Sequence, residues 1–329
     1  MAVPAGEVTR EGRLLLETLP ILGKRRRFPG APVQPQAQPE NKVPSPTEPF
    51  RTRRERLSGG RNLIIRKGPD EIERIARAGD LVAATIAHVG DHIQPGITTG
   101  ELDAIAGTFI AEQGGTSASK GYHGTYPAEI CISPNAMVVH GIPGPYRVED
   151  GDLLTIDVGV VLAGAIADSA YTFGVGTIDA EAQRLLDTCQ QALAAGIAEA
   201  LPGNRIGDIS HAVQTVVEGA GFSVVRSLVG HGVGRYYHED PHVPNFGQPG
   251  RGPKLSEGMT IAIEPMITAG SPDVYLHDDH WSISTEDGSL AAHFEHTVAI
   301  TTSGPRILTP RVGSAASRRA SNPHQTSWG

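Results

Sequence analysis

The sequence lacks the features that mark secreted and membrane proteins. Its 329 residues include two cysteines, Cys131 and Cys189, and neither stands in a CxxC or other zinc-ligand spacing. A disulfide framework is therefore not expected, and a reducing compartment fits best. No apolar run approaches the roughly 20 residues of a membrane span. The nearest candidate, "LLLETLPILG", is interrupted by Glu17 and Pro20 and has no small-residue cleavage site, so we predict a cytoplasmic protein without a membrane partner.

Several catalytic signatures are also absent. The chain has no GxSxG, HExxH or P-loop motif, so it carries no signature of an α/β-hydrolase, a zincin or a P-loop nucleotidase. The segment "GHGVGR" lacks the third glycine of a dinucleotide fingerprint and does not have the flanking pattern that such a fingerprint requires. We therefore do not expect nucleotide binding.

Positive charge is concentrated at the N-terminus. The formal net charge is −8, yet residues 1–61 hold 12 of the 28 Lys and Arg and only 6 of the 36 Asp and Glu. A basic leader thus precedes an acidic body. One interpretation is a solvated arm. The other is an arm that contacts an anionic surface such as the ribosome's RNA without recognising its sequence, and salt would weaken that contact steeply.

Composition and periodicity divide the chain into three parts. Residues 1–61 are rich in Pro and Arg and are predicted to be mostly disordered, and residues 310–329 are predicted to be a flexible tail. The body, 62–309, is predicted to be one domain of helices interleaved with strands. The expected helices are 70–90, 100–113, 179–201 and 207–220, and the expected strands are 128–132, 153–161, 165–173, 223–228, 259–264 and 292–300.

The apolar hairpin "LLTIDVGVVLAGAIADSAYTF" at 153–173 argues for antiparallel sheet, which makes α+β a better fold class than doubly wound α/β. An internal repeat indicates that the body is duplicated. "PGITTGEL" begins at Pro95 and "PGNRIGDI" begins at Pro202, 107 positions later. The same offset aligns "EDGDLLTID" with "SEGMTIAIE" and carries Asp157 onto Glu264. We predict two halves related by a pseudo-twofold axis, with these two carboxylates facing each other.

Four carboxylates lie in apolar strand-like segments: Asp157, Asp168, Glu264 and Glu295. An isolated ionised carboxylate in such surroundings costs several kcal/mol, and four together repel one another. Arginine pairing is the ordinary compensation, but these strands bring no basic residue. A pair of divalent metal ions is the alternative, because hard cations favour carboxylate oxygens.

Three histidines can complete such a site. His231 lies between two glycines in "VGHGVGRYYHEDP", where backbone can approach a ligand closely, and an imidazole suits Mn, Fe, Co or Zn. Two metals about 3.5–4 Å apart can deliver a shared water as hydroxide and polarise a carbonyl. His140 in "VVHGIPGP" and His238 in "YYHEDP" can shuttle a proton or hydrogen-bond a substrate carbonyl. These residues predict hydrolytic chemistry.

Seven segments in this order resemble one family: "GYHGTYPAEICISPN", "VVHGIPG", "TIDVG", "ADSAYTF", "GHGVGRYYHEDP", "IEPM" and "FEHTVAI". The resemblance is to type I methionine aminopeptidases, of the pita-bread metallopeptidase fold shared with prolidases and creatinase. It covers residues 62–309 as the catalytic domain and leaves an N-terminal extension. It implies an α+β fold whose duplicated halves form a curved antiparallel sheet covered by helices. Only 33 positions separate His231 from Glu264, which leaves no room for the helical insertion of type II enzymes.

Carried over residue by residue, the resemblance assigns two divalent cations (Co, Mn, Fe or Zn) to Asp157, Asp168, His231, Glu264 and Glu295. Asp157 would chelate one metal, and Asp168 and Glu295 would bridge both. His231 and Glu264 would complete the coordination of the other metal.

The resemblance also implies catalytic roles. His140 would contact the scissile amide nitrogen, His238 would lie near the substrate carbonyl, and Glu264 would accept a proton from the bridging water. The methionine side chain would lie against Tyr122, Cys131, Tyr237 and Trp281. "GYHGTYP" is one residue longer than the usual family spacing, so Tyr126 receives no role.

The implied function is removal of the initiator methionine from nascent proteins whose second residue is small, by water activated at a dinuclear metal centre. The partners would be nascent N-termini, and we expect a monomer. An Xaa-Pro peptidase uses the same five ligands but normally carries a large folded N-terminal domain, for which this leader is too short and too polar. A catalytically dead relative that acts as a binding module would have lost ligands, whereas all five are present here.

Overall fold

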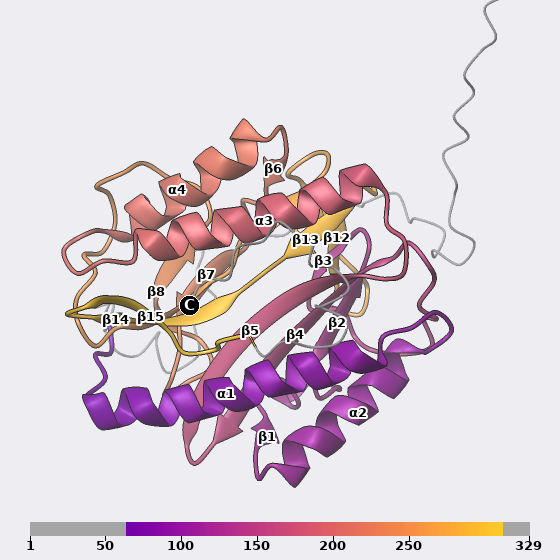
Figure 1. Cartoon of the computed structure of the whole chain (residues 1–329), viewed down its shortest axis with the longest axis horizontal. Helices are drawn as coiled ribbons and strands as arrows, with labels where there is room; N and C mark the ends of the chain where they lie inside the picture. Colours follow the sequence, from indigo (N-terminus) through magenta and orange to yellow (C-terminus); the bar gives the residue numbers. More distant parts are fainter. Residues whose placement is uncertain (1–63, 312–329) are drawn as a thin grey trace, which may run out of the picture. The chain divides into compact units, whose positions relative to one another are not determined.

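The computed structural model describes residues 64–311, so the predicted disordered arm and almost all of the predicted tail lie outside the described residues. Within this range the four predicted helices are confirmed, with ends that differ by one to three residues. They lie on two sides of the strands (Figure 1), with α1 (Pro69–His92) and α2 (Thr99–Glu112) on one side and α3 (Ala180–Ala198) and α4 (Ile206–Gly219) on the other. None of these helices is long and apolar enough to cross a bilayer.

Every strand pairing in the described residues is antiparallel, which confirms the predicted α+β class. Hydrogen bonds divide the strands into four sheets, ordered β1-β4-β2 with β5 on β4, β13-β10-β6, β11-β12-β3, and β15-β14-β9-β7-β8. The strand bounds are β1 Thr116–Ser117, β2 Cys131–Pro134, β3 Met137–Val139, β4 Leu153–Leu162, β5 Ala165–Gly174, β6 Ser223–Val224, β7 Val229–Gly232, β8 Glu239–Pro244, β9 Thr260–Ile263, β10 Met266–Thr268, β11 Val274–Leu276, β12 Ile283–Thr285, β13 Ala291–His293, β14 His296–Thr301 and β15 Gly304–Ile307.

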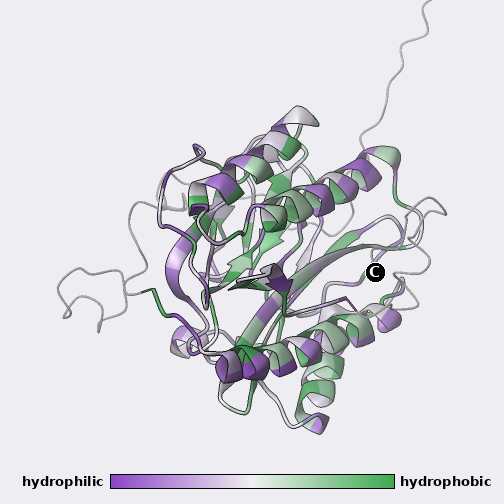
Figure 2. Cartoon of the chain, turned by 60° about the vertical axis from the view of Figure 1, so that its left-hand side comes forward, coloured by the Kyte–Doolittle hydropathy of each residue, from purple (hydrophilic) through white to green (hydrophobic). Residues whose placement is uncertain are grey.

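The helices bury apolar faces against these strands and leave polar faces outward (Figure 2). One core cluster joins α1 and α2 to β4 and β5, and a second joins α3 and α4 to β9 and β14. Phe294 is the largest fully buried side chain of the second cluster. Burial on this scale is the main source of stability in a domain of this size.

The predicted duplication is visible in the hydrogen bonds. Isolated bridges join Thr98 to Arg147 and Arg205 to Lys254, and each residue of the second bridge lies 107 positions after its counterpart in the first. Thr98 and Arg205 each precede the first residue of a helix. The backbone N–H of Thr98 donates to the Glu101 carboxylate at 2.8 Å, and the backbone N–H of Arg205 donates to the Asp208 carboxylate at 2.7 Å. The two halves therefore enter α2 and α4 through the same local structure.

The predicted strand over 292–300 is wrong in one respect, because it divides into β13 and β14. At the break, the backbone N–H of Phe294 bonds the Pro265 carbonyl at 3.3 Å, and that of Glu295 bonds the Ala170 carbonyl of β5 at 3.0 Å. The Glu295 backbone therefore pairs with the strand that carries Asp168. Likewise, the strand predicted over 223–228 is reduced to β6.

A buried ion pair fixes the loop that precedes β8. Lys67 Nζ lies 2.5 Å from Glu239 Oε2, with both side chains only 1% exposed. The other carboxylate oxygen of Glu239 accepts the backbone N–H groups of Arg235 at 2.7 Å and Tyr236 at 2.9 Å. Lys67 thus holds the loop that carries two predicted site residues, Tyr237 and His238.

We expect Lys67→Ala to lower the free energy of unfolding by about 3–5 kcal/mol, since it leaves the charge of the Glu239 carboxylate buried without a cationic partner. Chemical denaturation in urea measures this change. The matched control is Lys120→Ala, whose pair with Glu129 has side chains 57% and 25% exposed, and which should cost less than about 1 kcal/mol. Equal losses in both variants would contradict the structural importance of the buried pair.

Candidate metal centre

The two aspartates of the hairpin project from one face of the sheet. In the β4–β5 register, Asp157 faces Ala170 and Gly159 faces Asp168, so the two carboxylates are diagonal neighbours. Both are buried, at 8% and 4% exposed. A Cβ at Gly159 would lie 2.5 Å from the Tyr237 ring, so the glycine makes room for that predicted pocket residue.

Hydroxyl groups of Thr297 on β14 and Ser169 on β5 hold Asp168 and Glu295 together. The Thr297 hydroxyl donates to the Asp168 carbonyl at 2.8 Å and accepts the Asp168 N–H at 3.0 Å. The Ser169 hydroxyl donates to the Glu295 carbonyl at 2.5 Å. These contacts join residues 126 and 129 positions apart, and they fix the backbone under both carboxylates.

His231 lies on β7, and a hydrogen bond to the backbone fixes the orientation of its ring. Its Nδ1 is 2.9 Å from the Gly232 carbonyl oxygen, and because a carbonyl only accepts, the proton must be on Nδ1. Nε2 therefore presents a lone pair toward Asp168 Oδ2 at 3.7 Å and Glu264 Oε1 at 3.5 Å. The flanking glycines admit neighbouring strands, since a Cβ at Gly230 or Gly232 would lie 2.4 or 2.3 Å from a backbone oxygen.

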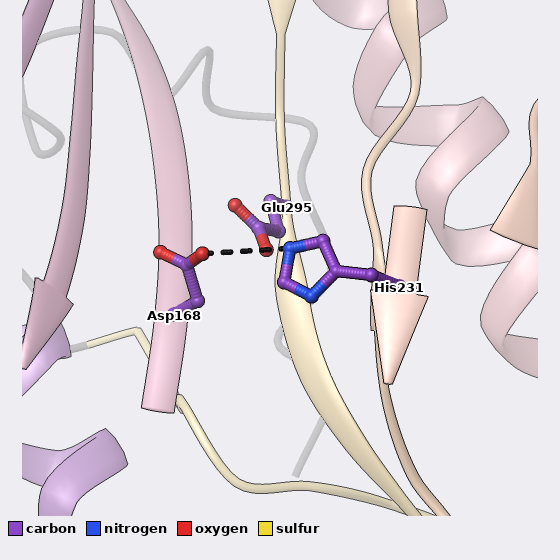
Figure 3. A group of neighbouring side chains, drawn as sticks. All are labelled: Asp168, His231 and Glu295. Atoms are coloured by element: carbon purple, nitrogen blue, oxygen red, sulfur yellow. Dashed lines mark ion pairs between the residues drawn. The ribbon is translucent and has the colours of Figure 1, made fainter. Parts of the chain in front are cut away.

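Three of the predicted ligands form a compact buried group. Asp168, His231 and Glu295 each offer one ligand atom, and these atoms lie within 4.8 Å of one another. The three side chains come from different segments and point toward a common centre (Figure 3). Glu264 and Asp157 adjoin the group, because Glu264 faces His231 and interacts electrostatically with Asp157.

Burial raises the pKa of all four carboxyl groups. The pKa of Asp157 rises to about 6 and that of Glu264 to about 7. The pKa values of Asp168 and Glu295 lie well above their usual range, because burial is reinforced by the neighbouring carboxylates. Between residues 64 and 311, none of the Lys or Arg ion pairs involves these four groups.

The donor set fits a divalent metal. Asp168 Oδ1 and Glu295 Oε1 are buried and accept no hydrogen bond, and the His231 lone pair faces carboxylate oxygens that cannot donate when ionised. Such an arrangement is repulsive without a cation and favourable with one. Carboxylates with one imidazole form a ligand set that Mn, Fe, Co and Zn accept.

The two other predicted histidines are close enough to His231 to interact with it electrostatically. His140 follows β3 in a left-handed conformation at φ 58°, a strained geometry for a non-glycine residue. Burial lowers the pKa of His140 to about 4, so the ring is neutral at pH 7. The His238 ring lies against the His231 ring with centroids 4.1 Å apart and the two planes tilted by 42°, and His238 Nδ1 lies 2.6 Å from the Tyr122 hydroxyl.

The residues predicted to surround a methionine side chain share a hydrophobic cluster. Cys131 packs with Tyr122 and Trp281, and Tyr237 adjoins them through its contact with Tyr122, with ring centroids 5.2 Å apart. Tyr126, which had no predicted role, is also in the cluster. The Tyr126 hydroxyl lies within hydrogen-bonding distance of the Ile130 and Gly141 carbonyls. The centroids of the Tyr126 and Trp281 rings are 5.1 Å apart.

Sequence reasoning missed His293. This residue ends β13 and is 1% exposed, with Nε2 3.6 Å from Glu264 Oε2. A single histidine beside an apolar segment has the appearance of an ordinary core residue. Its spacing of two from Glu295 was the only available signal.

Comparisons with known proteins agree with this geometry. A model of metallopeptidase family M24 matches residues 73–302. Relatives include a methionine aminopeptidase of Clostridium perfringens, 51% identical over 247 residues, and methionine aminopeptidase 1 of Bacillus subtilis, 49% identical over 247 residues. Each alignment covers 75% of this chain and 99% of the relative, which fits an N-terminal extension.

Solved structures show the same fold. The methionine aminopeptidase of Thermotoga maritima matches with a TM-score of 0.73 and 43% identity, over 75% of this chain and 99% of that one. The prolidase of Pyrococcus furiosus matches with a TM-score of 0.61 over 76% of this chain and 66% of that one, and at 23% identity this likeness concerns the fold alone. The predicted pita-bread fold is confirmed. By sequence and by structure, the chain belongs to metallopeptidase family M24, whose members use divalent metal ions.

Proposed function

We propose that this protein is a methionine aminopeptidase, a hydrolase that removes the N-terminal methionine of nascent proteins whose second residue is small. The observation that carries the proposal is the buried group of carboxylates and imidazole made by Asp168, His231 and Glu295. It lies beside the hydrophobic cluster that contains Cys131 and Trp281. The high identity to relatives named for this activity supports the same assignment.

The proposed metal ligands are Asp157, Asp168, His231, Glu264 and Glu295, which would hold two cations of Co, Mn, Fe or Zn. When bound, such cations lower the pKa of a water molecule and polarise a carbonyl. The unsatisfied oxygens of Asp168 and Glu295 support this ligand role. The proton fixed on His231 Nδ1 supports it too, because it leaves Nε2 free to bind.

The chain's other residues would bind and orient the substrate. Glu264 would accept the proton of the attacking water. His140, which is neutral at pH 7, can hydrogen-bond the scissile amide nitrogen, and His238 can reach the substrate carbonyl. The cluster that contains Cys131 and Trp281 would hold the methionine side chain, whose thioether packs well against aromatic rings.

Peptide hydrolysis by the metal-loaded full-length protein tests the proposal. We expect kcat/KM for methionine release from Met-Ala-Ser to exceed that from Met-Lys-Ser by at least about 100-fold, because a small second residue avoids a steric penalty of a few kcal/mol. An Xaa-Pro dipeptide is the control substrate. Hydrolysis of that dipeptide with no methionine release from either tripeptide would overturn the assignment.

Contact of the basic arm with the ribosome stays a prediction, because the arm lies outside the described residues. We also propose that the protein is monomeric and cytoplasmic. If the arm binds ribosomal RNA, its removal should weaken ribosome association at low salt and leave tripeptide hydrolysis nearly unchanged.

A further inference from the structure

His293 is a buried titratable residue that the proposed mechanism does not use. Both of its ring nitrogens are buried and have no hydrogen-bond partner. Its backbone is held firmly, since its N–H donates to Thr172 Oγ1 at 2.9 Å and its carbonyl accepts the same hydroxyl at 2.8 Å. A buried imidazole without a partner costs free energy, so its position calls for a specific interaction.

The ring lies against one oxygen of Glu264. His293 Nε2 is 3.6 Å from Glu264 Oε2, while His231 Nε2 is 3.5 Å from Glu264 Oε1. The Glu264 carboxylate thus lies between two imidazoles, and each imidazole faces a different oxygen. At 3.6 Å there is no hydrogen bond, but a shift of about 0.7 Å would bring the pair to hydrogen-bonding distance.

The two imidazoles differ in what fixes their protons. The Gly232 carbonyl holds the His231 proton on Nδ1, so His231 cannot donate from Nε2 while it is neutral. No partner within residues 64–311 holds the His293 proton on Nδ1, so the tautomer with the proton on Nε2 is available. His293 can therefore donate to Glu264, and a neutral His231 can only accept at Nε2.

We propose that His293 is a positioning residue for Glu264. Once that shift of about 0.7 Å has closed the gap, His293 donates Nε2–H to Oε2 and so directs Oε1 toward the place where His231 would bind a cation. This inference rests on the proposed ligand role of Glu264. Partners of this kind orient a metal ligand, and their loss typically lowers metal affinity by about 10–100-fold.

Calorimetric titration of the metal-free full-length protein with Co²⁺ tests the inference. We expect His293→Leu, which fills the site but cannot donate, to weaken Co²⁺ binding by about 10–100-fold. His293→Gln places an N–H near the Nε2 position and should bind within about threefold of the wild type, whereas the shorter His293→Asn should resemble the leucine variant. The Gln and Asn variants decide the question if His293→Leu fails to fold.

Two controls separate this inference from the proposed function. His277→Gln changes a half-buried histidine that pairs with Ser284 away from the metal centre, and it should leave Co²⁺ binding unchanged. Glu264→Ala should weaken binding at least as much as His293→Leu. Wild-type affinity in His293→Leu would overturn the inference, and so would equal weakening by Gln and Asn. The proposed function is tested separately by methionine release from the wild-type protein, and it stands if that release is observed, whatever the variants show for Co²⁺ binding.

Discussion

Asp168→Asn should reduce kcat/KM for Met-Ala-Ser by about a thousandfold or more, equivalent to roughly 4 kcal/mol of transition-state stabilisation. Asp168 belongs to the buried group, with Oδ2 3.7 Å from His231 Nε2 and Oδ1 without a hydrogen-bond partner. An amide keeps the size of the side chain but removes the negative charge that a shared cation requires. Steady-state kinetics at saturating Mn²⁺ or Co²⁺ measures the effect.

The same substitution should stabilise the metal-free protein. Asp168 is buried with three other carboxyl groups and has no Lys or Arg partner within the described residues, so an uncharged side chain relieves repulsion. We expect the free energy of unfolding at pH 8 to rise by about 1–3 kcal/mol. Asp80→Asn, on the exposed face of α1, should change neither quantity. Loss of both activity and stability would instead indicate a structural role for Asp168.

Metal removal should make stability fall as pH rises above about 6.5. Glu264 has a pKa raised to about 7, and burial and the neighbouring carboxylates raise the pKa values of Asp168 and Glu295 well above their usual range. In this window the folded protein retains protons that the unfolded chain has already released near pH 4, so its stability decreases with pH. Each retained proton contributes a slope of about −1.4 kcal/mol per pH unit.

The window must begin above pH 6.5 because buried histidines act in the opposite direction below it. Burial lowers the pKa of His140 and His293 to about 4, so rising pH stabilises the fold until the unfolded-state histidines have lost their protons. Urea unfolding at pH 6.5, 7.5 and 8.5, with chelator or with excess Mn²⁺, tests the prediction. We expect a falling curve with chelator and little pH dependence with metal. A flat curve in chelator would show that the carboxyl groups are not proton-coupled to folding.

Some of the site could be predicted because its carboxylates stand in strands that are otherwise apolar, where charged residues are not expected. Asp157 and Asp168 interrupt apolar strands of period two, and the 107-residue offset linked Asp157 to Glu264. Those signals are local or periodic, and they survive in a single sequence. The family resemblance then supplied roles that the residues alone left open.

Other features could not be predicted, because they depend on contacts between distant segments. Lys67 and Glu239 are 172 positions apart, and neither stands in a periodic pattern. The strand break at Glu295 depends on hydrogen bonds to Pro265 and Ala170, which the local sequence does not encode. His293 has the same appearance as a core histidine until its distance to Glu264 is known.

The hydroxyl contacts that join β5 to β14 also have a consequence for timing. Thr297 holds the Asp168 backbone from 129 positions away, and Ser169 holds the Glu295 backbone from 126 positions away, so the candidate metal centre requires both halves of the domain. Such long-range contacts form late, after the entropy of closing a large loop has been overcome. The set of candidate ligands is therefore complete only once the chain has been made through Glu295, close to the end of the described residues.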